Sequence, residues 1–157
     1  MKVNFNTIVL PLPSDELLNI VEKSLRVSFP ELYREFIKRN NGAVPITNVF
    51  THNQNKYVIE RFLCILEESE ADEINGWYDI EVIITQIGER LTDNEDLIGL
   101  NIVPIVALFS GDFVCLDFRK TEDPSVVVWY HEESGEFSPV IKTVAQNISE
   151  FFGMLEE

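Results

Sequence analysis

Three apolar runs follow one another closely in the second half of the chain and set the strongest limit on its fold. They read NIVPIVALF (101–109), DFVCLDFR (112–119) and SVVVWYHEE (125–133), and only Ser110-Gly111 and KTEDP separate them. Short runs of β-branched and aromatic residues between turn residues are typical of consecutive antiparallel strands. Both alternating faces of the middle run are apolar, which predicts a central strand in a β-meander.

Two helices are predicted ahead of these strands. Ser14 is a good N-cap for the first helix. Its apolar residues recur at helical spacing: Leu17, Leu18, Val21 and Leu25. The stretch FPELYREFIKRNNG (29–42) predicts a second helix that has Pro30 at its first position and ends at Asn41-Gly42. The residues predicted to face inward on this helix are Tyr33, Phe36 and Ile37.

The remaining segments add strands and two more helices. Residues 47–67 are rich in β-branched and aromatic residues and predict further strands. A third helix is predicted from the spacing of Ile80, Ile83, Ile84, Ile87 and Leu91. A last helix is predicted to begin at Ser138-Pro139, with an apolar stripe of Val144, Ile148, Phe151, Phe152 and Leu155. Strands gathered in a meander, with helices largely at the ends, predict a single α+β domain over residues 1–157.

The net charge of −15 is distributed unevenly along the chain. Residues 1–66 hold 8 Lys or Arg against 6 Asp or Glu, whereas residues 67–157 hold 4 against 21. Such a field repels nucleic acids and anionic membranes, and it complements a basic partner. On composition alone, simple solubility explains the acidity equally well. The densest acidic stretch, EESEADE (67–73), is too charged to pack and predicts an exposed loop.

Motifs that would indicate an enzyme are absent from the sequence. It contains no nucleophile elbow, no glycine-rich phosphate loop and no cluster of His, Asp and Glu at metal-ligand spacing. We therefore expect a protein without catalytic activity, metal or cofactor. His52 and His131 stand in polar surroundings and are expected to be surface residues. Cys64 and Cys115 stand in apolar surroundings without a CxxC partner and are expected to be buried free thiols.

The expected location follows from the apolar segments. No apolar run approaches the ~20 residues of a membrane helix. The first residues, MKVNFNTIVLPLPSDE, contain a short apolar patch but no cleavage site of small residues. We therefore expect a cytoplasmic protein that does not bind membranes.

Asp112 and Asp117 lie within the most apolar part of the chain. Because they are five residues apart, they project to opposite faces of one strand and cannot share a proton or a metal ion. Asp112 is predicted to accept backbone N–H groups in the turn that follows Ser110-Gly111. Asp117 needs a partner if it is buried, and Arg119 is expected not to reach it from the same strand. A structural role is predicted for Gly111, Asp112 and Asp117.

The aromatic residues could in principle stack on nucleic-acid bases, but base-stacking platforms come with a cationic groove. The surroundings of Trp77, in INGWYD (74–79), are acidic instead. Trp77 is therefore predicted to be a core residue or, as the second choice, an anchor for a protein partner.

Several segments follow one another in a recognisable order. They are the helix from Pro30-Glu31-Leu32-Tyr33 to Asn40-Asn41-Gly42, the segments FLCI, VPIVALFSGDFVCLDFR and VVVWYHEE, and the C-terminal ISEFFGML. Together they resemble the SUKH superfamily. The resemblance extends from Ser14 to Leu155 and lies in the order and spacing of these segments. It implies an α+β fold with a mixed, mostly antiparallel central sheet, N-terminal helices, one inserted helix and a C-terminal helix.

The resemblance also implies a function. Many bacterial members of this superfamily are immunity proteins that neutralise toxins, often nucleases, and others are scaffolds or regulators. We expect an immunity protein whose acidic surface binds a cognate toxin, with a basic nuclease domain as the expected partner. The alternative is a non-enzymatic binding, scaffolding or regulatory module with another protein partner. The oligomeric state stays open. The candidate toxin-binding residues are Glu67, Glu68, Glu70, Asp72, Glu73, Asp93, Glu95 and Asp96.

Overall fold

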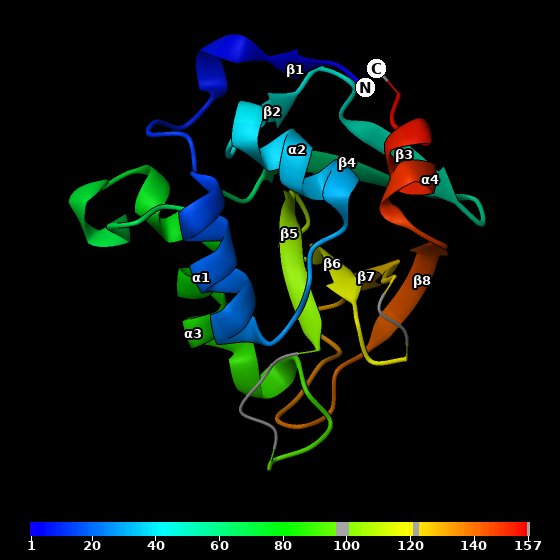
Figure 1. Ribbon diagram of the computed structural model, residues 1–157. Coiled ribbons are helices and arrows are strands. Elements are labelled where there is room, and N and C mark those ends of the chain that lie inside the picture. Colours follow the sequence, from blue (N-terminus) through cyan, green and yellow to red (C-terminus); the bar gives the residue numbers. More distant parts are fainter. Residues whose placement is uncertain (97–100, 121–122, 157) are drawn as a thin grey trace.

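The main feature of the fold is a six-stranded sheet whose strands are ordered as in the sequence (Figure 1). The computed structural model describes residues 1–96, 101–120 and 123–156. The strands are β3 (Val49–His52), β4 (Asn55–Phe62), β5 (Ile102–Leu108), β6 (Phe113–Asp117), β7 (Ser125–Trp129) and β8 (Ile141–Ala145). Every neighbouring pair is antiparallel. The predicted meander and the central position of β6 are therefore confirmed.

The described residues also form four α-helices and a small second sheet. The helices are α1 (Asp15–Leu25), α2 (Glu31–Asn40), α3 (Ile80–Ile87) and α4 (Ile148–Gly153). Strands β1 (Val3–Asn4) and β2 (Val44–Pro45) pair with each other. Within the described residues, parallel pairing is limited to one isolated bridge between Cys64 and Asp79. The predicted α+β class is confirmed. None of the described helices combines the length and the apolar composition needed to cross a membrane.

The two N-terminal helices, α1 and α2, begin within one residue of the positions that their N-terminal residues predict. Ser14 caps α1, because its Oγ accepts the N–H of Leu17 at 3.1 Å. Pro30 is the N-cap of α2 instead of its first helical residue, a shift of one position. The residues predicted to face inward on α2 are buried: Tyr33, Phe36 and Ile37.

The prediction of a helix beginning at Ser138-Pro139 is wrong. Residues Ile141–Ala145 form strand β8, which pairs with β7. The last helix begins only at Ile148, where the side chain of Asn147 accepts the N–H of Glu150 at 2.8 Å. Val144 and Ile148 are four residues apart and therefore fit a helical stripe, but Val144 is buried from a strand and Ile148 from a helix.

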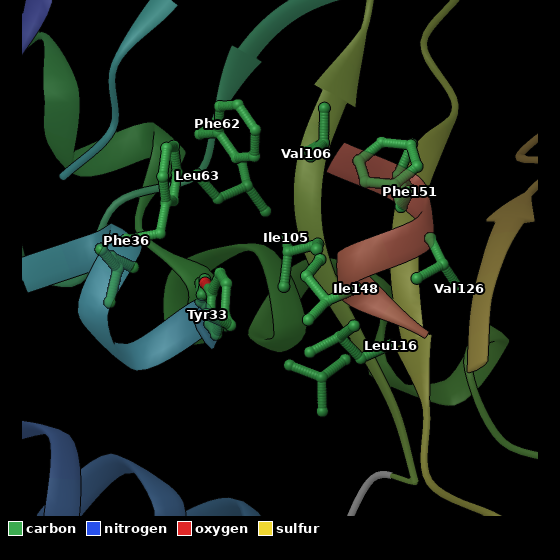
Figure 2. Packing of buried hydrophobic residues seen from close by; sticks show 14 of the residues in the cluster. Tyr33, Phe36, Phe62, Leu63, Ile105, Val106, Leu116, Val126, Ile148 and Phe151 are labelled. Atoms are coloured by element: carbon green, nitrogen blue, oxygen red, sulfur yellow. The ribbon is translucent and has the colours of Figure 1, made fainter. Parts of the chain in front are cut away.

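Both faces of the central strands β5, β6 and β7 are apolar and covered. Buried residues of α1, α2 and α4 pack on one face, where Val114 and Leu116 of β6 point. Figure 2 shows this core around Tyr33, Phe62 and Phe151. A second cluster contains Cys115 and Trp129 on the other face of the strands, with Leu91 and the partly buried Ile84 and Ile87 packed against it. This double burial explains why the runs in the sequence are apolar on both faces.

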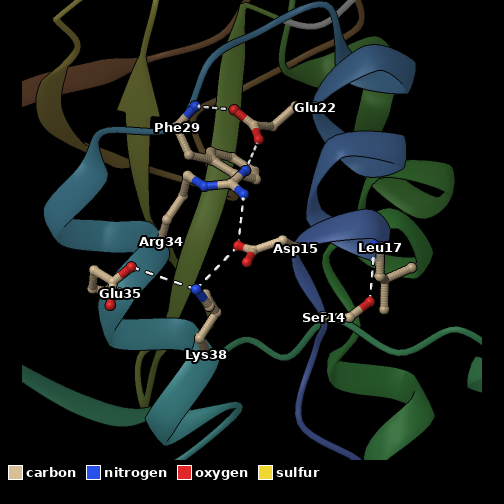
Figure 3. A network of polar contacts seen from close by, with 8 residues as sticks. All are labelled: Ser14, Asp15, Leu17, Glu22, Phe29, Arg34, Glu35 and Lys38. Atoms are coloured by element: carbon tan, nitrogen blue, oxygen red, sulfur yellow. Dashed lines mark hydrogen bonds and ion pairs between the residues drawn. The ribbon is translucent and has the colours of Figure 1, made fainter.

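Charged side chains join α1 to α2 (Figure 3). Arg34 of α2 pairs with Glu22 and, at 3.1 Å, with Asp15. Lys38 reaches the same Asp15 carboxylate at 3.0 Å. The second oxygen of Glu22 accepts the backbone N–H of Phe29 at 2.8 Å, which fixes the turn between the two helices. Most basic side chains of α2 are thus occupied within the fold.

Candidate functional site

The acidic stretch 67–73 lies in the connection between β4 and α3, which projects from the side of the molecule (left in Figure 1). Two short 3₁₀ helices shape it, η2 (Ser69–Ala71) and η3 (Asn75–Tyr78). We call residues 67–78 the acidic loop. Its four glutamates are exposed, as predicted: Glu67, Glu68, Glu70 and Glu73.

Asp72 differs from these glutamates because its carboxylate is used inside the acidic loop. Its oxygens accept the backbone N–H groups of Ile74 and Asn75 at 3.2 and 2.8 Å and the side-chain amide of Asn75 at 3.0 Å. The hydrogen bond from the backbone of Asn75 is the main cause that lowers the pKa of Asp72. Asp72 therefore shapes the acidic loop, and it is the weakest contact candidate of the five acids.

The acidic loop is held closed at its base. The buried Asp79 caps α3 by accepting the N–H groups of Glu81 and Val82, and it also accepts the N–H of Leu66 at 2.8 Å. Burial raises the pKa of Asp79. Within the loop, Gly76 packs so close to Ser69 that a Cβ would lie 2.1 Å from the Ser69 carbonyl oxygen. The exposed glutamates are therefore carried by a closed loop with a defined backbone.

The prediction that Trp77 belongs to the core is wrong. Its side chain is 64% exposed, and Ile74 is 76% exposed. The neighbouring Tyr78 turns inward instead, where its hydroxyl donates to Glu60 at 2.9 Å and Arg61 lies 4.2 Å from the ring centre. Because the loop projects from the sheet, Trp77 has no core within reach. Contiguous exposed apolar patches rimmed by polar residues mark interaction sites, and tryptophan is enriched among binding hot spots.

Open grooves border the acidic loop, and two of them are lined mainly by its residues. One, of about 580 Å³, runs between the glutamates, Ile74 and the exposed Leu10 of the N-terminal segment. The other, of about 420 Å³, lies beside Trp77 and Val82. Both are lined by acidic and apolar residues together. The loop thus offers concave apolar surface with carboxylates at its rim, a pattern that suits a partner with basic and apolar side chains.

The second predicted acidic cluster is separate from the acidic loop. Asp93, Glu95 and Asp96 follow the 3₁₀ helix η4 (Gly88–Arg90), whereas the acidic loop precedes α3. All three are exposed, and Asp93 pairs with Arg119 at 3.6 Å. The structure does not bring the two clusters together, because α3 and η4 stand between them (Figure 1).

Gly111, Asp112 and Asp117 occupy turn and strand positions. Gly111 has a φ of +91°, which suits glycine. Asp112 accepts the backbone N–H of His131 at 2.9 Å and so links two strand ends. The expectation that Arg119 cannot reach Asp117 is wrong. Strand β6 ends at Asp117, and beyond it the backbone N–H and the guanidinium of Arg119 both turn back to the Asp117 carboxylate at 3.0–3.1 Å.

The structural role of Asp117 can be tested by one substitution. We expect Asp117→Asn to lower the free energy of unfolding by about 1–2 kcal/mol, because a charge-assisted pair on a 10% exposed side chain is weakened. Chemical denaturation measures this change. Asp93→Asn is the control, because Asp93 contacts the same Arg119 but is 63% exposed, and we expect little change. A D117N protein of unchanged stability that no longer binds its partner would contradict the structural role.

The cysteines are buried free thiols, as predicted. Burial raises the pKa of Cys64 to about 12 and that of Cys115 well above its usual value, so neither is a nucleophile at neutral pH. Both histidines are half-buried: His52 is the last residue of β3, and His131 lies in the turn after β7. Over residues 1–96, 101–120 and 123–156, no three His, Cys, Asp or Glu side chains gather closely enough to hold a metal ion.

Comparisons with known proteins identify the family. Searches of curated proteins and of solved structures gave no match. A protein-family model described as SUKH_6, SMI1-KNR4 cell-wall, matches residues 15–152. This range begins at the first residue of α1 and extends into α4, so it includes the whole six-stranded sheet and the acidic loop. The match covers most of the chain, and the protein therefore belongs to the SUKH_6 family within the SUKH superfamily.

Proposed function

We propose that this protein is a cytoplasmic immunity protein that binds and neutralises a cognate bacterial toxin through the acidic loop. SUKH domains are in general associated with immunity proteins of toxin-immunity systems. The observation that carries the proposal is the exposure of Trp77 and Ile74 among four exposed glutamates on a closed, projecting loop.

A basic nuclease is the partner that this surface suits best. Nucleases hold phosphates with positive side chains, and an acidic protein can occupy such a site in place of the substrate. Binding of this kind requires a complementary surface and no catalytic groups on the immunity protein. The exposed carboxylates attract the partner from a distance, and the apolar side chains hold it once the two surfaces meet.

Co-expression is the direct test of the proposal. The protein encoded by the neighbouring gene is the first toxin candidate, and we expect this chain to rescue cells from it and to form a complex with it in vitro. A binding or scaffolding module with a regulatory partner would form a complex without rescuing growth. Rescue therefore distinguishes the two functions.

The contribution of the loop charge is measured by a matched pair of variants. The loop variant E67Q/E68Q/E70Q/E73Q removes the four exposed charges and keeps Asp72, which shapes the backbone. We expect its association rate with the toxin to fall about tenfold, with a smaller salt dependence, and its dissociation rate to change little.

The control variant E132Q/E133Q/E136Q/E150Q removes four glutamate charges after β7, and we expect a smaller effect on the association rate. If both variants behave alike, net charge and not the acidic loop steers binding. If neither changes the rate, the cluster Asp93, Glu95 and Asp96 becomes the next candidate.

A further inference from the structure

A cationic groove lies at the C-terminal end of α1, in a protein of net charge −15. Its volume is about 760 Å³. Lys23 and Arg26 line it from the end of α1, and Arg119 and Lys120 line it from the segment after β6. These are four of the 12 Lys and Arg in the whole chain. Among the residues that the structure describes, Glu22 is the single acidic residue of the lining.

The described carboxylates that line this groove or contact its cations are already occupied. Glu22 is bound to Arg34 and to the backbone N–H of Phe29 (Figure 3). Asp117 and Asp93 neutralise Arg119. Within the described residues, no carboxylate forms an ion pair with Lys23, Arg26 or Lys120. The groove therefore holds three positive charges that the rest of the described fold leaves uncompensated.

The stabilisation of helix ends does not account for this arrangement. Cations at the C-terminus of α1 interact favourably with its carbonyl groups, which explains Lys23 and Arg26. This helix-end effect does not explain Lys120, which lines the groove from the segment after β6. Positive charge that converges from two elements on one concavity is what an anionic ligand requires.

We propose that this groove binds a small phosphate ester of nucleotide size. Its phosphate group would contact Lys23, Arg26 and Lys120, which pair with no carboxylate of the described residues. Val27 and Phe118, both half-buried in the lining, provide an apolar wall for the organic part of the ligand. The volume lies within the range of small-molecule sites. Because the whole chain repels polyanions, a free mononucleotide fits the groove better than the terminal phosphate of a nucleic acid.

Titration with adenosine monophosphate tests the proposal, with binding followed by calorimetry and by NMR shifts of the groove residues. We expect a Kd of about 1 mM or lower that weakens with salt. Adenosine, which lacks the phosphate, is expected not to bind. A 5′-phosphorylated oligonucleotide is expected to bind more weakly than the mononucleotide, and tighter binding would show that the nucleic-acid end is the ligand and overturn the choice of a free nucleotide.

Two charge-matched variants locate the site. K23Q/R26Q/K120Q removes the three groove cations that pair with no described carboxylate, and we expect nucleotide binding to weaken about tenfold or more. R39Q/K56Q/K142Q makes the same change in net charge outside the groove lining and is expected to keep binding. Equal loss in both variants, or no binding to the unmodified protein, would overturn the proposal. Because the groove shares no residue with the acidic loop, the groove variant is expected to neutralise toxin normally, and the two proposals fail separately.

Discussion

Replacing Asn41 by alanine is expected to lower the free energy of unfolding by about 3 kcal/mol. Asn41 follows α2 and is completely buried. Its Nδ2 donates to the carbonyl oxygens of Val9 and Ile65 at 3.3 and 3.1 Å, and its Oδ1 accepts the N–H of Ile65 at 2.8 Å. Alanine would leave these backbone groups buried without a partner. An unsatisfied buried polar group costs about 1–3 kcal/mol, and more than one group is affected.

Chemical denaturation of two neighbouring variants measures this effect. Asn40→Ala is the control, because the Asn40 side chain is half-buried and, within the described part of the chain, donates only to the Phe36 carbonyl of its own helix, at 3.2 Å. We expect this control to lose less than about 1 kcal/mol. Asn41→Asp keeps the acceptor but loses the amide donor and adds charge, and it should also be strongly destabilised. Equal stability of N41A and N40A would show that the hydrogen bonds from Asn41 to Val9 and Ile65 do not stabilise the fold.

The segment Asn41-Gly42 shows what the sequence could and could not predict. Its role in ending a helix is a local signal, and the structure confirms it: α2 ends at Asn40, and Gly42 has a φ of +65°. The close packing there is not local. A Cβ on Gly42 would lie 2.7 Å from Val9 and 2.9 Å from Cys64, and the partners of Asn41 are 24 and 32 residues away in sequence. No periodicity in the sequence reports such contacts.

Among the strands and helices, too, some were predictable from local sequence signals and others were not. The meander was predictable because each strand is apolar on both faces and each turn has its own residues. Strand β8 was not, because Val144 and Ile148 match a helical spacing equally well and only pairing with β7 decides between the two. The side chain of Asn147 accepting the N–H of Glu150 is the cap that marks the true helix start.

The candidate site was also predictable only in part. Its acidic character could be predicted from composition, and the glutamates are exposed as their density predicted. The exposure of Trp77 was not readable, because an aromatic residue beside Tyr78 suits a core equally well. The direction of each ring depends on the loop backbone, which the hydrogen bonds of Asp72 and the close packing of Gly76 fix. One local signal was available: Asp72 is followed three residues later by Asn75-Gly76, a turn-forming pair.

Replacing Trp77 by alanine is expected to weaken toxin binding about 100-fold while leaving the fold intact. The side chain is 64% exposed in the free protein, so its removal opens no cavity in the core. In a complex the same ring would be buried beside Glu70 and Glu73, which line the same groove and place their carboxylates at the edge of the contact. Tryptophan in such a position contributes about 2 kcal/mol or more to binding.

The kinetics of the complex separate this effect from that of charge. An apolar anchor acts after the surfaces have met, so W77A should raise the dissociation rate and leave the association rate and its salt dependence unchanged. The loop variant E67Q/E68Q/E70Q/E73Q should instead lower the association rate and its salt dependence and leave the dissociation rate almost unchanged. Phe109→Ala is the control, because Phe109 is 67% exposed in the β5–β6 turn and lies outside the acidic loop. If F109A and W77A weaken binding equally, or if W77A changes only the association rate, Trp77 is not the anchor and the apolar part of the interface must be sought elsewhere on the surface.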